Sequence, residues 1–68
     1  MQPLHKVYYR YTHSSGKQVT AVDCELVPDP LTATALTRIF YGILPEFEII
    51  GLESWTGNQW VPVPYLRP

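Results

Sequence analysis

The sequence predicts a small α+β domain in which four strands and one helix follow the order ββαββ. Two segments rich in Val and Tyr flank a turn that contains Gly16, which is typical of a β-hairpin. A helical apolar pattern comes next, and a second pair of apolar segments ends the chain. With 68 residues the chain has room for one domain, which we expect to cover residues 1–68.

The first hairpin is predicted from residues 5–13 and 18–27, whose Val and Tyr content favours strands. Residues 14–17 then form the turn, and Gly16 can adopt the positive φ that a loop of three or four residues requires.

A helix of about three turns is predicted over residues 31–41. Asp29 is a suitable N-cap and Pro30 fits the first helical position, while Gly42 is expected just past the end of the helix. Five apolar residues at helical spacing are expected to face the sheet. They are Leu31, Ala35, Leu36, Ile39 and Phe40.

The last two strands are predicted at residues 47–55 and 60–65, joined by a tight turn at residues 56–59. Pro62 and Pro64 are two residues apart, so both lack an N–H on the same side of the strand, which places that strand at a sheet edge. Numbered along the chain, the strands are then expected in the order 2-1-3-4, all antiparallel, with the helix on one face.

Pairing Trp55 with Trp60 across the second turn assigns side chains to the two faces of this sheet. The side chains expected beneath the helix are Val7, Tyr9, Tyr11, Val22, Cys24, Leu26, Ile50, Leu52, Val61 and Val63.

A single helix leaves the other face of the sheet uncovered. The residues expected on that face are Tyr8, Arg10, Ile49, Trp55, Trp60 and Pro62. Large exposed apolar patches mark interaction sites, and Trp, Tyr and Arg are frequent interface anchors. We therefore interpret the chain as a non-catalytic protein-binding module of the inhibitor or adaptor type, with a homodimer through this face as a special case. A bulge or one-residue slip would instead turn the Trp pair inward.

Single-stranded nucleic-acid binding is the alternative hypothesis. Lys6, Tyr8, Arg10 and Thr12 alternate on the outward side of the first strand, and aromatic and basic side chains on an open sheet can stack on bases. Five basic residues against six acidic ones weigh against it, because phosphate contacts dominate such affinity.

An enzyme is the third hypothesis. Cys24 lies near His13 in the predicted hairpin, but a buried structural thiol is the preferred interpretation. His5 and His13 would lie about 26 Å apart on an extended strand and cannot share a metal ion.

The remaining candidates are two carboxylate pairs, Asp23 with Glu25 and Glu46 with Glu48, which are interpreted as solubilising strand residues. No catalytic residue, cofactor or metal site is assigned.

The lone cysteine rules out an intramolecular disulfide, and no apolar leader follows Met1. A reducing, cytoplasmic setting is therefore expected. Net charge is −1, but residues 1–20 carry only basic residues and residues 21–55 mostly acidic ones, so the two segments are expected to lie close together.

Overall fold

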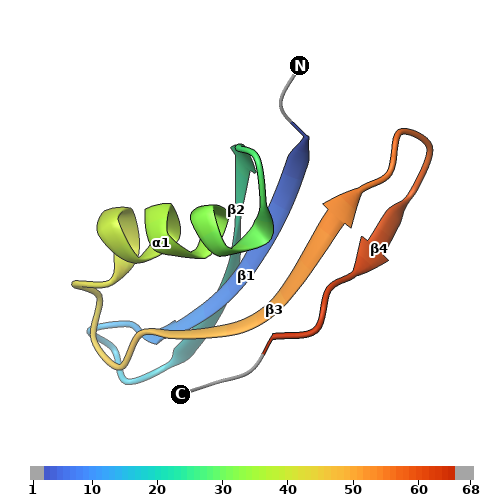
Figure 1. Ribbon diagram of the computed structural model, residues 1–68. Helices are drawn as coiled ribbons and strands as arrows, with labels where there is room; N and C mark the ends of the chain where they lie inside the picture. The colour runs from blue at the N-terminus through green and yellow to red at the C-terminus, as the bar shows by residue number, and fades with distance from the viewer. Residues whose placement is uncertain (1–2, 66–68) are drawn as a thin grey trace.

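The computed structural model describes residues 3–65, which form a four-stranded antiparallel sheet with one helix across one face (Figure 1). The strand order is β2-β1-β3-β4, as predicted. The elements are β1 (Leu4–Thr12), β2 (Gln18–Leu26), α1 (Pro30–Tyr41), β3 (Glu48–Trp55) and β4 (Trp60–Pro62). Within the described range, no helix is long and apolar enough to cross a membrane.

The β1–β2 loop is one residue longer than predicted. Thr12 pairs with Gln18, and the N–H of His13 donates to the carbonyl of Lys17 at 2.7 Å. The loop therefore has five residues, and Gly16 adopts the predicted positive φ of 89°. Because side chains alternate along a strand, this single residue turns the whole of β2 over relative to the predicted register.

The reversal of β2 corrects the assignment of its three apolar residues to the core. Val22 and Leu26 are 48% and 63% exposed, and Cys24 is also exposed. Their neighbours Asp23 and Glu25 point to the helix side instead, where both are half-buried. The interpretation of Cys24 as a buried structural thiol was therefore wrong.

A bulge in β3 corrects a second assignment. The register with β1 shifts between Tyr8, which pairs with Gly51, and Tyr9, which pairs with Ile49, so Ile50 is the extra residue. Ile49 consequently lies on the helix side and is 3% exposed, whereas it was predicted on the uncovered face. Ile50, predicted beneath the helix, is only half-buried.

The N-terminal end of α1 agrees with the prediction, and the C-terminal end differs from it in its backbone angles. The Asp29 carboxylate accepts the Thr32 N–H at 2.8 Å, and Pro30 occupies the first turn. Gly42 has right-handed backbone angles rather than a positive φ. Glycine is suited to this position because the Arg38 carbonyl oxygen lies close to its Cα. An added Cβ would be only 2.4 Å from that oxygen.

The buried side of α1 is not the apolar stripe that was predicted. The helix buries Ala33, Thr34 and Thr37, while Leu31, Ala35, Ile39 and Phe40 are exposed and only Leu36 packs against the core. Small side chains let the helix lie close to the sheet. The buried hydroxyls are satisfied, because Thr34 donates to the Leu31 carbonyl and Thr37 to the Ala33 carbonyl.

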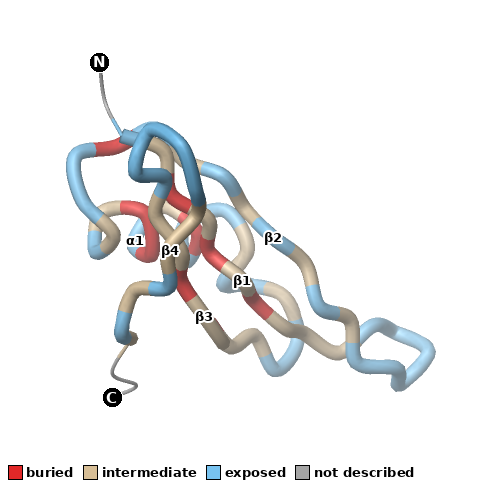
Figure 2. Tube along the Cα trace, turned by 90° about the vertical axis from the view of Figure 1, so that its right-hand side faces the viewer, coloured by how far each residue is buried: buried red, intermediate tan, exposed pale blue. Residues whose placement is uncertain are grey.

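The core lies between α1 and the central strands β1 and β3, and the buried residues lie on these three elements and, at Val27, on the segment before α1 (Figure 2). Its apolar members are Val7, Tyr9, Val27, Ala33, Ile49 and Leu52. Burying one such aliphatic side chain contributes roughly 1.5–3 kcal/mol, a large share of the stability of a domain this small. The edge strand β2 receives less cover from the helix and is exposed or half-buried throughout.

The second hairpin has the predicted register. Trp55 pairs with Trp60, and Ser54 with Val61. Regular pairing ends at Pro62, earlier than predicted, although the Val63 N–H still donates to the Leu52 carbonyl at 3.0 Å. The alternating prolines keep β4 short and at the edge.

Candidate protein-binding surface

The helix-free face of the sheet combines apolar margins with a polar centre. Directly opposed residues share a face, so the register of β1 with β2 brings Lys6 beside Cys24 and Tyr8 beside Val22. Leu26 extends this margin at the end of β2. The resulting apolar row on β2 joins the predicted surface, although sequence reasoning had placed it in the core.

The two tryptophans form the opposite margin of this face. Their ring centroids are 5.4 Å apart, and the planes are tilted by 57°. Trp55 is 38% exposed, so the bulge in β3 does not turn the pair inward as one alternative had required. The Lys6 ammonium lies 4.2 Å from the centre of the Trp60 ring, a cation–π contact that partly covers this ring.

Between the margins, side chains of β1 and β3 pair across the strands. The Tyr8 hydroxyl donates to a Glu53 carboxylate oxygen at 2.5 Å, and this hydrogen bond is the main reason that the pKa of Tyr8 is raised. Arg10 forms an ion pair with Glu48. The basic first strand and the acidic later segment therefore do lie together, as their charge pattern predicted.

Five of the six predicted surface residues thus lie on the helix-free face: Tyr8, Arg10, Trp55, Trp60 and Pro62. Ile49 is the exception and belongs to the core. The additions are the three β2 residues. These residues were assigned to the core because the apolar alternation of β2 alone favours burial of Val22, Cys24 and Leu26. The five-residue loop, which reverses the two sides of β2, could not be read from that alternation.

The candidates for acid–base or thiol chemistry have structural contacts instead. Cys24 lies opposite Lys6, and His13 is in the hairpin loop, where its ring contacts Ser15. Glu46 accepts a hydrogen bond from Thr12 at 2.6 Å. Over residues 3–65, no group of three or more His, Cys, Asp or Glu side chains could hold a metal ion.

His5 is a buried polar residue that sequence reasoning did not identify. Its Nε2 lies 3.1 Å from the Val27 carbonyl, which can only accept, so this nitrogen carries a proton. Its Nδ1 lies 2.7 Å from the Ser54 hydroxyl. Both ring nitrogens are thus engaged in joining β1 to the segment before α1 and to β3.

Asp23 and Glu25 form the remaining polar cluster, on the helix side of β2. The Thr37 hydroxyl lies 3.0 Å from an Asp23 carboxylate oxygen, so its single proton is shared between this oxygen and the Ala33 carbonyl. A hydrogen bond with Asp23, together with partial burial and the Asp23 charge, raises the pKa of Glu25 to about 7.

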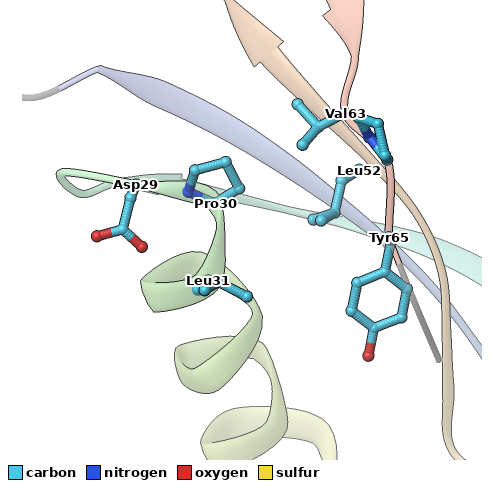
Figure 3. A pocket seen from close by; sticks show the side chains of 7 residues that line it. Asp29, Pro30, Leu31, Leu52, Val63 and Tyr65 are labelled. Carbon is cyan, nitrogen blue, oxygen red and sulfur yellow. The ribbon is translucent and has the colours of Figure 1, made fainter. Parts of the chain in front are cut away.

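An open groove of about 400 Å³ lies elsewhere, between the start of α1 and the end of β4. Figure 3 shows Leu31, Leu52, Val63 and Tyr65 around it. Its lining is apolar apart from Asp29, whose carboxylate already caps the helix, and the Tyr65 hydroxyl, which accepts a hydrogen bond from Arg38. A groove with this lining can accept an apolar side chain but supplies no acid, base or nucleophile.

The chain matches no protein-family model, no curated protein and no solved structure. The role of the surface is therefore inferred from its own residues.

Proposed function

We propose that this chain is a non-catalytic protein-binding module that contacts its partner through the helix-free face of the sheet. The observation that carries the proposal is the exposed apolar row of Val22, Cys24 and Leu26 on the same face as Trp55 and Trp60. Exposed apolar groups on both margins favour burial by a partner, and Trp is a frequent anchor of such interfaces.

The paired polar groups in the centre of the face fit the same proposal. The Tyr8–Glu53 and Arg10–Glu48 contacts hold these side chains in place before a partner arrives. Side chains that are already ordered lose less conformational entropy on binding. Inhibitors and adaptors are the functional types that such a small contact module supplies.

These contacts favour a protein partner over single-stranded nucleic acid. Lys6 already lies over Trp60, and Arg10 is paired with Glu48. Glu53 adds a further carboxylate to the face on which phosphates would have to lie. The phosphates of a nucleic-acid strand would therefore meet basic side chains that already have partners, and carboxylates that repel them.

A reducing, cytoplasmic setting is part of the proposal. Cys24 is free and exposed in the middle of the proposed contact face. An exposed thiol stays reduced in the cytoplasm, because the thiol systems of that compartment keep cysteines reduced.

Photo-crosslinking in the native host tests the proposal. A photoreactive amino acid at Val22 or Leu26 should give an adduct with one dominant protein, and the same group at Ser15 in the hairpin loop should not. With that protein purified, Leu26→Asp and Trp55→Ala should each weaken binding at least about tenfold, while the exposed loop variant Lys17→Ala binds as the parent does. Adducts with nucleic acid alone would count against the proposal, as would equal labelling from all three positions.

A further inference from the structure

The outer edge of β2 is open along the whole strand. β2 ends the sheet order β2-β1-β3-β4, so within residues 3–65 it pairs with β1 on one side and with no strand on the other (Figure 2). All nine residues of β2 pair with β1 in an unbroken register. A strand of this length at a sheet edge presents a row of unpaired N–H and C=O groups, to which a further strand can pair.

The hydrogen bonds at the two ends of the β1–β2 pairing identify these groups. The Val27 N–H donates to the Pro3 carbonyl at 3.1 Å. The His13 N–H donates to the Lys17 carbonyl at 2.7 Å. Hydrogen-bonded pairs alternate along an antiparallel ladder, so the odd-numbered residues of β2 bond to β1. The backbone groups that point outward are those of the even-numbered residues, namely Gln18, Thr20, Val22, Cys24 and Leu26.

The two edges of the sheet differ in their protection against a further strand. At the β4 edge the regular strand has three residues, and Pro62 and Pro64 supply no N–H. β2 contains no proline, no lysine and no bulge, the features that commonly keep an edge strand from pairing. Its protection is the pair of carboxyl groups of Asp23 and Glu25, which point to the helix side.

This acidic pair makes the open edge selective for charge. No ion pair within residues 3–65 involves either carboxyl group. His5, opposite Glu25 on β1, uses both ring nitrogens in other hydrogen bonds, and Arg38 of α1 donates to Tyr65. The hydrogen bond with Asp23, together with partial burial, raises the pKa of Glu25, which agrees with a carboxyl pair that lacks a cation. A strand that brings carboxylates to this side is repelled, whereas lysine or arginine would form ion pairs across the strands.

The other side of an added strand would meet apolar groups. Val22 and Leu26 are 48% and 63% exposed, and Cys24 between them is exposed as well. Side chains alternate along a strand, so a segment with basic residues at every second position directs the intervening residues to this side. Apolar residues at the intervening positions would extend the helix-free face beyond β2.

We propose that the open edge of β2 binds an extended segment of the partner protein as a fifth, antiparallel strand. The segment has basic side chains beside Asp23 and Glu25 and apolar side chains on the helix-free side. Antiparallel pairing continues the pattern of the sheet and is slightly more stable per residue than parallel pairing. The inference rests on the proposed function, since the segment belongs to the protein that contacts the helix-free face, and it identifies the contact as strand addition.

A synthetic peptide tests strand addition to the full chain. The probe is a capped peptide of about seven residues in which lysine and valine alternate. It should bind saturably with a Kd of about 1 mM or tighter. The same peptide with glutamate in place of lysine should bind at least about tenfold more weakly. In the antiparallel geometry the valine N–H groups face β2, so N-methylation of the valines should abolish binding, while N-methylation of the lysines should not.

Amide hydrogen exchange in the saturated complex locates the peptide. Exchange at Val22, Cys24 and Leu26 should slow at least about tenfold, because their N–H groups gain partners. The double variant Asp23→Asn with Glu25→Gln should lose at least about tenfold in affinity for the lysine peptide. Glu46→Gln, which removes a charge from an exposed turn, is the matched control and should bind as the parent does.

Absence of binding at about 1 mM lysine peptide would overturn the proposal. Equal binding of the glutamate peptide, or binding that survives N-methylation of the valines, would overturn it too. If the peptide fails while the purified partner still crosslinks from Leu26 and loses affinity with Trp55→Ala, the partner contacts the face without adding a strand. If crosslinking finds no protein at all, the proposed function fails whatever the peptide does, so the two failures are distinguishable.

Discussion

The carboxyl groups of Asp23 and Glu25 share the helix side of β2, and their hydrogen bond raises the pKa of Glu25 from 4.5 to about 7. Charges that point inward on an edge strand discourage pairing with another strand. Two copies that met edge to edge through β2 would bring four such carboxyls together. The Asp23–Glu25 pair therefore disfavours edge-to-edge pairing of two copies through β2.

The raised pKa of Glu25 predicts that stability falls with rising pH. Below about pH 4.5 this carboxyl is protonated in both states, and between 4.5 and 7 the unfolded chain ionises while the folded one keeps its proton. The free energy of unfolding therefore decreases across this range and levels off above pH 7. Because Glu25 is only half-buried, solvent screening limits the effect to about 1 kcal/mol.

Glu25→Gln should remove this pH dependence, because its amide can still donate to Asp23 without ionising. Urea unfolding at pH 5 and pH 8 measures the difference. The variant should be more stable than the parent at pH 8 and similar at pH 5. Glu46→Gln, which removes one charge from an exposed turn, is the matched control, and the same gain in that variant would show that net charge is the cause.

The bulge in β3 predicts different costs for two adjacent isoleucines. Ile49 is 3% exposed, so Ile49→Ala should lower the free energy of unfolding by about 2–5 kcal/mol. Ile50 is the extra residue of the bulge and is half-buried, so Ile50→Ala should cost less than about 1.5 kcal/mol. Chemical unfolding of both variants measures this contrast. Equal costs, or a larger cost at Ile50, would mean that β3 has the register without the bulge.

Gly42 predicts a steric effect at the end of α1. An added Cβ would lie 2.4 Å from the Arg38 carbonyl oxygen, so Gly42→Ala must shift the last turn of the helix. We expect a loss of about 1–3 kcal/mol, the range for forced backbone movement. Gly16→Ala is a useful comparison, because Gly16 has free space around it but a φ of 89°, so any loss there would come from backbone strain alone. A neutral Gly42→Ala in thermal unfolding would contradict this steric expectation.

The fold was predictable because its turns and helix caps depend on residue types that can be recognised locally in the sequence. Gly16, the Asp29–Pro30 pair and Gly57 mark the boundaries, and the alternating prolines specify the edge strand. The strand order followed from two conditions: the last strand lies at an edge, and every neighbouring pair is antiparallel. These signals do not depend on which side of a strand packs inward.

The allocation of side chains to faces was only partly predictable. In β2, one residue of loop length decides whether Val22 or Asp23 lies beneath the helix, and the apolar pattern favoured Val22. In α1, apolar residues occupy more than half of the circumference, so periodicity could not tell the core side from the outer side. In both elements, the misassigned apolar residues are the ones that now form exposed surface.

Reaction of Cys24 with a thiol reagent tests the proposed binding face most directly, because this single thiol lies within it, opposite Lys6. In the free folded protein, Cys24 should react rapidly and completely without denaturant. In complex with the purified partner, the rate should fall at least about tenfold, as expected for a group inside an interface core. An unchanged rate in a demonstrably saturated complex would contradict the claim that the helix-free face binds the partner.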